Sequence, residues 1–154
     1  MDIPAKNYIF ASLFLLANRL QTLGDMVTKE ITLKQWLLLI MILNIGKEHP
    51  SVTEIARFMG STRQNTRKML DVLSAKGYVA LRTNPQDKRN LAVSLTPQTF
   101  AFFSRFETKG DDFLEQLFCG IDADLLEGTM RTFIMIFDNL ERMEEQYGKN
   151  SGNL

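Results

Sequence analysis

The apolar residues of this chain recur mostly at helical spacing. Between residues 5 and 23 they form one broad stripe, after which Gly24 predicts the end of a helix. Residues 33–45 predict a second helix, which is apolar almost all round from Trp36 to Leu43. Because such a helix must be covered on every side, we expect it to lie at the centre of the fold.

Three capping boxes follow one another in the first half of the chain, beginning at Thr32, Ser51 and Ser61. In each box the hydroxyl can accept a hydrogen bond from the amide three residues later. The Gln or Glu side chain at that later position can accept one from the amide of the capping residue. The second box predicts a short helix stopped by Gly60, and the third predicts a helix that runs to about Lys76. Two short helices joined by a tight glycine turn indicate a helix-turn-helix.

The pattern then changes to short, partly alternating, β-prone segments at residues 78–82 and 91–95, with turn formers between them. These segments predict a β-hairpin. The rest of the chain predicts two more helices, at about 97–119 and 123–147, the first opened by a Thr-Pro pair. The expected fold is therefore mainly α with a small β-hairpin.

The formal net charge of zero hides a strong asymmetry along the chain. Residues 51–90 carry eight Lys or Arg against three acidic residues, a net charge of +5. Residues 107–154 carry four Lys or Arg against eleven acidic residues, a net charge of −7. Opposite charges in separate regions indicate that one part of the protein meets an anion and another part does not.

The helix expected after Gly60 combines an apolar face with a polar one. Thr66, Met69, Leu70 and Leu73 recur at helical spacing and should face the core. An outward first turn of Arg, Gln and Asn suits DNA reading, because Arg pairs with guanine and Gln or Asn with adenine; a solvated charged face is the plainer alternative. The predicted DNA contacts of this helix are Ser61, Thr62, Arg63, Gln64, Asn65, Arg67 and Lys68.

The turn between the two strands carries Lys88 and Arg89, close to Asn84 and Pro85. Such a basic tip can reach the minor groove beside the helix, where an arginine gains from the negative potential of the groove. Asp87 can hold the Arg89 guanidinium by a charge-assisted hydrogen bond. Alone the tip is an ordinary polar turn, but directly after a helix-turn-helix it indicates a DNA-binding wing.

Residues 33–96 resemble the DNA-binding part of the MarR family of transcriptional regulators. The matching pieces are the segments 52–57 (VTEIAR), 66–73 (TRKMLDVL), 76–79 (KGYV) and 95–97 (LTP), and the wing 84–89 (NPQDKR), which is similar to the family's Asp-x-Arg signature. The flanking helices match only in position and apolar character. Arg63, Gln64 and Asn65 together depart from the commonest pattern, so the operator sequence does not follow from the resemblance.

The resemblance implies a winged helix-turn-helix at residues 32–96, between N-terminal (1–31) and C-terminal (97–154) dimerisation helices. It implies a homodimer that binds a pseudopalindromic operator in double-stranded DNA, acts as a repressor, and is released by a small, often phenolic, ligand. Residues 62–68 would read the major groove, Arg89 would enter the minor groove and Asp87 would brace it. A winged-helix module that binds other proteins and not DNA is the alternative.

Pairing of two chains also follows from the apolar residues near both ends. Residues 133–137 are five apolar residues in a row, which sweep more than one helical turn, so a single monomer core cannot easily cover them all. A twofold dimer would bury this surface, and a larger monomeric core is the alternative. The expected interface residues are Ile9, Phe10, Leu13, Phe133, Ile136, Phe137 and Leu140.

The chain offers little for catalysis or metal binding. One histidine (His49), one cysteine (Cys119) and no glycine-rich phosphate loop leave no nucleophile–base pair or metal cluster, so we expect neither an enzyme nor a cofactor. Cys119 lies among apolar residues and is expected to be a buried thiol. Phe14, Trp36 and Phe103 form the expected pocket for a small aromatic effector, with plain core packing as the alternative.

The N-terminal residues lack the basic and apolar succession of a signal peptide. The longest apolar run, at residues 36–43, is much shorter than the ~20 residues needed to span a bilayer. A single cysteine suits a reducing compartment. We therefore expect a cytoplasmic protein without membrane contact.

Overall fold

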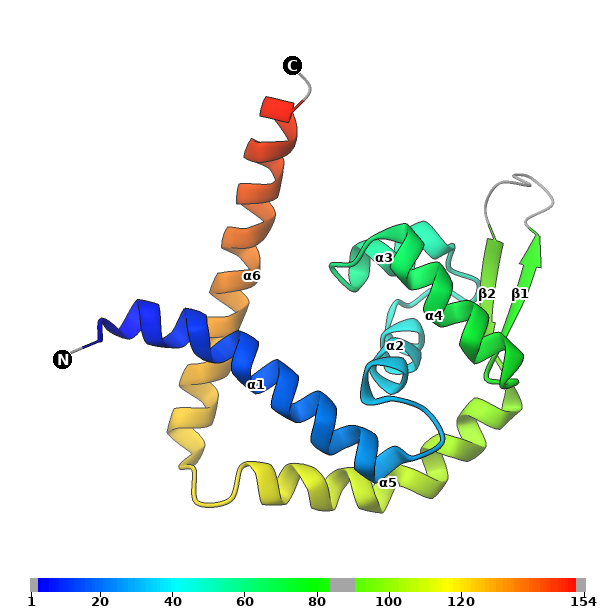
Figure 1. Ribbon diagram of the computed structural model, residues 1–154, viewed down its shortest axis with the longest axis horizontal. Coiled ribbons are helices and arrows are strands. Elements are labelled where there is room, and N and C mark those ends of the chain that lie inside the picture. The colour runs from blue at the N-terminus through cyan, green and yellow to red at the C-terminus, as the bar shows by residue number, and fades with distance from the viewer. Residues whose placement is uncertain (1–2, 84–90, 152–154) are drawn as a thin grey trace. The chain divides into compact units, whose positions relative to one another are not determined.

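The computed structural model describes residues 3–83 and 91–151, which form six α-helices and two β-strands (Figure 1). Contacts divide the chain into two compact units, Met1–Gly110 and Asp111–Leu154. The elements in chain order are α1 (Ala5–Thr28), α2 (Leu33–Asn44), α3 (Val52–Phe58), α4 (Arg63–Ala75), β1 (Val79–Thr83), β2 (Leu91–Leu95), α5 (Pro97–Leu117) and α6 (Ala123–Ser151).

The starts of α2, α3 and α4 confirm two of the predicted capping boxes and correct the third. The hydroxyls of Thr32 and Ser51 each accept a hydrogen bond from the amide three residues on, and the Gln or Glu there accepts one in return. The cap of α4 is Thr62, whose Oγ1 accepts from the amide of Asn65 at 3.2 Å. The expectation that Ser61 opens this helix was wrong by one residue, because the Ser61 amide closes the preceding turn.

Gly24 does not end α1, contrary to expectation, because the helix continues to Thr28. The glycine is buried inside the helix, where a Cβ would stand 2.6 Å from Cδ2 of Leu33 at the start of α2. A contact this close excludes any larger side chain. The glycine therefore permits close approach of α1 to α2.

The core of the first unit is built on one face of α2. Leu38 and Leu39 are fully buried there, whereas Leu37 and Leu43 on the remaining surface of the helix are 44% and 48% exposed. The central position of α2 is thus confirmed, but its coverage on every side is not seen within the chain. The other fully buried large side chains include Val52, Ile55, Leu70, Leu73, Val93 and Phe102.

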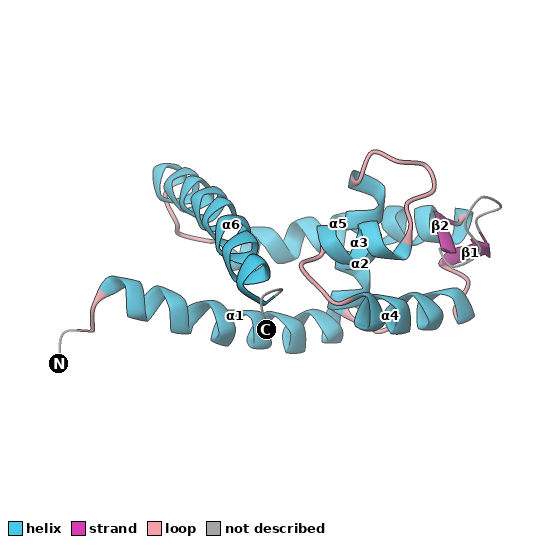
Figure 2. Ribbon diagram, turned by 90° about the horizontal axis from the view of Figure 1, so that it is seen from above, coloured by secondary structure: helices cyan, strands magenta, loops and turns pink. Residues whose placement is uncertain are grey.

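Strands β1 and β2 pair antiparallel, with Val79 opposite Leu95 and Thr83 opposite Leu91. A bridge between Ser51 and Ala92 joins β2 to the residue that caps α3. Figure 2 shows this small sheet in magenta among helices. A helix-turn-helix followed by an antiparallel hairpin is a winged helix, so the predicted fold class is confirmed.

The second unit contains the end of α5 and the long helix α6. The turn between these helices contains Gly120, which has the left-handed φ of 76° that favours glycine. Cys119 in this turn is exposed, so the expectation of a buried thiol was wrong for the single chain. None of the helices in residues 3–83 and 91–151 is long and apolar enough to cross a membrane.

Candidate nucleic-acid interface

Helix α4 has one fixed face and one exposed face, as its sequence predicts. Thr66, Leu70 and Leu73 are fully buried. The exposed residues of its first two turns are Arg63, Gln64, Asn65, Arg67 and Lys68, preceded by exposed Thr62 and half-buried Ser61. The structure therefore brings the predicted helix residues together on one surface, with their direction set by the core.

The turn before α4 fixes the start of this surface. Gly60 has a left-handed φ of 58°, and the amide of Ser61 donates a 2.9 Å hydrogen bond to the carbonyl of Ala56. This bond closes the C-terminal end of α3, whose Val52 and Ile55 are buried. The helix-turn-helix is therefore held by backbone bonds and by the core.

An ion pair on the exposed face orients one of the predicted contacts. Arg67 Nε donates to Asp71 Oδ1 at 2.8 Å, one helical turn on, and both side chains are about half exposed. Such a pair contributes about 0.3–0.5 kcal/mol to helix stability. Its main consequence is that the Arg67 guanidinium lies along the helix, with its terminal nitrogens left to meet an anion.

A hollow of about 440 Å³ lies beside this face and was not foreseen from the sequence. Arg63, Gln64 and Arg67 contribute its polar lining, and Val52 and Leu91 contribute apolar atoms from the starts of α3 and β2. Two guanidinium-bearing side chains in one concave surface favour a negatively charged partner.

A second ion pair fixes the start of α3. Lys47 Nζ donates to Glu54 Oε1 at 2.7 Å, and the other carboxylate oxygen accepts from the Ser51 amide at 2.7 Å. These hydrogen bonds lower the pKa of Glu54 from 4.5 to about 2, and the bond from Lys47 has the largest effect. Glu54 therefore stays ionised at neutral pH and holds the capping box closed.

The structure describes the base of the predicted wing but not its tip. Asp87, Lys88 and Arg89 lie outside the described residues. At the base, Arg82 and Thr83 end β1 as exposed residues. Arg82 was missed by the sequence analysis, although the alternating pattern of the strand, within the basic segment, was a signal for it.

Residues 30–90 match the model of the MarR family. The match covers about two fifths of the chain, so this part of the chain is similar to the MarR family. The HTH-type transcriptional regulator PapX of Escherichia coli is 26% identical over 91 residues, which are 58% of this chain and 56% of PapX. The match thus spans little more than half the length of this curated relative.

Solved structures share the fold of this chain. A MarR protein from Peptoclostridium difficile has a TM-score of 0.80 at 17% identity, covering 92% of this chain and 94% of the other. The S. aureus MepR-DNA complex has a TM-score of 0.75 at 16% identity, covering 90% of this chain and 99% of MepR. At these identities the likeness shows the fold alone.

The three residues of the predicted effector pocket lie in unlike surroundings. Trp36 and Phe103 are half-buried and pack against the core, whereas Phe14 on α1 is 62% exposed and touches Phe10 edge to face. Trp36 also lies beside Gly110, since a Cβ there would stand 3.5 Å from its ring. The pocket stays a prediction.

The predicted dimer residues belong to α1 and α6, in different units of the chain. Within the single chain, the apolar side chains on both helices are largely exposed. On α1 these are Ile9 and Phe10, with Leu13 half-buried; on α6 they are Phe133, Phe137 and Leu140, with Ile136 half-buried. The surface predicted to pair is thus open in one chain, and pairing itself stays a prediction.

The histidine and acidic residues do not gather into a metal site in the part of the chain that the structure describes. His49 lies before α3, where its Nδ1 is 2.9 Å from the hydroxyl of Ser94 on β2. This contact gives the ring a structural partner at the edge of the small sheet.

Proposed function

We propose that this chain is a transcriptional regulator of the MarR family that binds double-stranded DNA by sequence. The observation that carries the proposal is the exposed polar start of α4, whose opposite face is fixed in the core. The likeness to MepR, which was solved in a complex with DNA, and to the transcriptional regulator PapX supports it.

In the proposed complex, α4 enters the major groove. Arg63 pairs with guanine, Gln64 and Asn65 pair with adenine, and Arg67 and Lys68 meet phosphates. The N-terminal end of α4 adds a modest positive potential that favours a nearby phosphate. Both arginines line the hollow beside the helix, and their positive charges support contact with a negatively charged partner.

The wing makes the second proposed contact. Arg89 enters the neighbouring minor groove, Asp87 braces it and Lys88 meets the backbone, while the exposed Arg82 at the base of the wing adds a positive charge. An Arg89→Ala variant should lose operator affinity by about tenfold or more, the effect of roughly 1–3 kcal/mol. Unchanged affinity would remove the wing from the proposal.

The proposed active species is a homodimer, in which α1 and α6 bury their exposed apolar side chains against a second copy. Residues 1–31 and 97–154 then serve dimerisation, and residues 32–96 serve DNA binding. A twofold pair presents two α4 helices to successive major grooves about 34 Å apart, which suits a pseudopalindromic operator. Occupying such a site in a promoter gives repression.

Release by a small aromatic effector is proposed at Phe14, Trp36 and Phe103. The ligand must bind more tightly to the conformation with the wrong half-site spacing, because equal affinity for both conformations shifts nothing. The half-buried Trp36 and Phe103 offer the apolar contact such a ligand needs. A phenolic ligand that lowers operator affinity, and loses this effect in Trp36→Ala, is the expected result.

Selection of bound sequences from a random duplex pool tests the proposal. The wild-type protein should enrich two inverted half-sites, and Gln64→Ala should relax the selected base at one position in each. Gln116→Ala on α5, an exposed glutamine remote from α4 in sequence, is the matched control and should select the wild-type site. If no sequence is enriched, the proposal is wrong and a protein-interaction module becomes the better explanation.

A further inference from the structure

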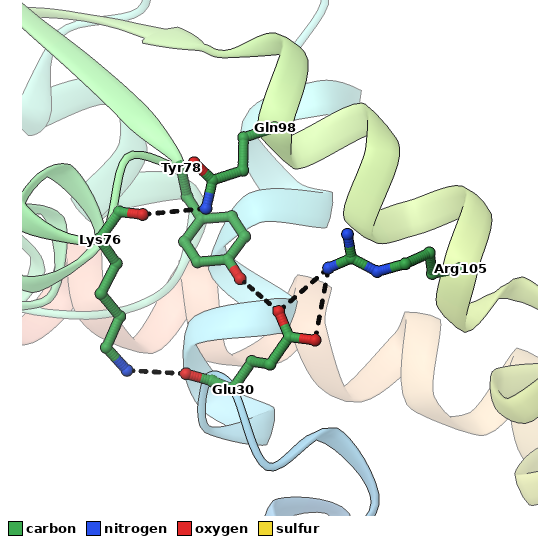
Figure 3. A network of polar contacts seen from close by, with 5 residues as sticks. All are labelled: Glu30, Lys76, Tyr78, Gln98 and Arg105. Atoms are coloured by element: carbon green, nitrogen blue, oxygen red, sulfur yellow. Dashed lines mark hydrogen bonds and ion pairs between the residues drawn. The ribbon is translucent and has the colours of Figure 1, made fainter.

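The link between α1 and α2 is bound to two distant segments of the first unit through one residue, Glu30 (Figure 3). Its backbone carbonyl accepts a 2.8 Å hydrogen bond from Lys76 Nζ at the end of α4. Its carboxylate accepts from the hydroxyl of Tyr78 at 2.9 Å and from Arg105 Nη2 on α5 at 3.0 Å. Glu30 therefore touches both the end of α4 and the middle of α5.

Tyr78 is the fixed point of this network. Its ring is buried and meets Phe102 of α5 edge to face, with centroids 5.6 Å apart. Its amide donates to the carbonyl of Leu73 in α4, and its carbonyl accepts from the hydroxyls of Thr96 and Thr99. Tyr78 thus cannot move without moving the end of α4 or the start of α5.

Another hydrogen bond joins the end of α4 to α5 next to Tyr78. Gln98 Nε2 donates to the carbonyl of Lys76 at 3.0 Å. Gly77 between them has a left-handed φ of 83°, and a Cβ there would stand 2.6 Å from Gln98 Oε1. The end of α4 is therefore held by backbone geometry as well as by Glu30.

Two hydrogen bonds close the link between α1 and α2 around Glu30. Asp25 Oδ1 in the last turn of α1 accepts from the amide of Leu33 at 2.6 Å. The buried hydroxyl of Thr28 donates to the carbonyl of Ile31. Because these bonds close the link on either side of Glu30, the carboxylate follows the position of α1 relative to α2.

The ion pair between Glu30 and Arg105 is too exposed to contribute much to the stability of the fold. The Glu30 side chain is 45% exposed and that of Arg105 is 54% exposed, and pairs in such surroundings contribute little to folding. Burial and the Glu30 carboxylate raise the pKa of the Tyr78 hydroxyl further above neutrality, and the protonated hydroxyl donates to Glu30. The bonds are thus few and directional, which suits them to orienting α4.

We propose that Glu30 is a positioning residue for DNA reading, which ties the end of α4 to α1 and α5 through its bonds to Lys76, Tyr78 and Arg105. The inference rests on the proposed function, since it concerns how α4 is aimed at DNA. Weakening the carboxylate bonds to Tyr78 and Arg105, while the bond from Lys76 to the Glu30 carbonyl remains, lets α4 tilt relative to the two helices that flank the winged part. The variant protein then accepts half-site spacings that the wild type rejects.

The test compares three duplexes: the site selected by the wild-type protein from a random pool, and the same site with one base pair added or removed between its halves. The wild type should prefer the selected spacing by tenfold or more. In Glu30→Gln and Arg105→Gln this preference should fall at least threefold, with the unfolding midpoint and self-association unchanged. Arg105→Lys, which keeps a donor for Glu30, should restore part of it.

Glu107→Gln on α5 is the matched control, because this exposed glutamate has no hydrogen bond or ion pair within the described residues, and it should keep the wild-type preference. If Glu30→Gln weakens binding equally at all three spacings, or leaves binding unchanged, the positioning role is overturned while DNA binding stands. If the wild type binds none of the pool, the proposed function fails and this inference falls with it.

Discussion

The α-carbon of Gly24 in α1 lies directly against the side chain of Leu33, the first residue of α2. A Cβ added to Gly24 would stand 2.6 Å from Cδ2 and 2.9 Å from Cβ of Leu33, closer than real side-chain contacts. Leu33 is bound in place by the capping box and by the carboxylate of Asp25. The two helices therefore meet at a point where a glycine is required.

Replacing Gly24 with alanine should destabilise the protein, although alanine is usually better than glycine inside a helix by about 0.5–1 kcal/mol. Overpacking against Leu33 should cost about 1–3 kcal/mol. Urea unfolding measures the difference. Gly110→Ala is the control, because its Cβ would make an ordinary 3.5 Å contact with Trp36, and it should be neutral or stabilising. Equal effects of both variants would contradict the close contact.

Thr66→Val should stabilise the protein by about 1 kcal/mol. The Thr66 hydroxyl is buried in α4 and has no hydrogen-bond partner among the residues that the structure describes, so valine of nearly the same shape removes an uncompensated polar group. Thr99→Val is the matched comparison: its buried hydroxyl donates to the carbonyl of Tyr78, and its loss should cost about 1 kcal/mol. Thermal unfolding should move in opposite directions, and a shift in the same direction would show that Thr66 has a partner.

The stability contributed by Glu54 should depend on pH in the acid range. Its pKa is lowered from 4.5 to about 2 in the folded state, so the contribution is complete above pH 4.5 and is lost as the pH falls through about 2. The side chain is 42% exposed, so solvent screening limits the effect to about 1 kcal/mol or less. Glu54→Gln keeps an acceptor for the capping box.

Urea unfolding of the wild type and Glu54→Gln at pH 6, 4 and 2.5 measures this effect. At pH 6 the wild type should have the larger free energy of unfolding. The difference from Glu54→Gln should become smaller as the pH falls. A constant difference over this range would mean that the bonds to Lys47 and Ser51 do not depend on the charge of Glu54.

Phe137→Asp should convert the proposed dimer into a monomer. Phe137 on α6 is 70% exposed in the single chain, and a buried carboxylate at an apolar interface is strongly unfavourable. Sedimentation equilibrium measures the change, with Gln146→Asp on the same helix as a control that should remain paired. A monomeric wild type would overturn the role of this surface.

Local signals predicted most of the secondary structure. A capping box is satisfied within four residues, so Thr32 and Ser51 could be identified from sequence as the starts of α2 and α3. Gly24 could not be interpreted in the same way. A glycine permits both a helix end and a close helix contact, and the choice depends on Leu33 in another helix.

The candidate site was predictable to a similar depth. The helical period of Thr66, Leu70 and Leu73 separates the buried face of α4 from the exposed one, and the structure confirms that division. The contacts that orient α4 escaped the sequence, since Glu30 and Tyr78 are 48 residues apart. Only the folded chain brings these two residues together, and no local sequence pattern predicts their contact.

Equilibrium binding of the wild-type protein to a mixed-sequence duplex, over a range of salt concentrations, tests the central claim most directly. Counterion release predicts that the logarithm of the affinity falls linearly with the logarithm of the salt concentration, with a slope of about −0.9 for each phosphate neutralised. Lys68→Ala should reduce the size of that slope by about one phosphate contact. A protein that binds no duplex even at the lowest salt concentration would contradict the account.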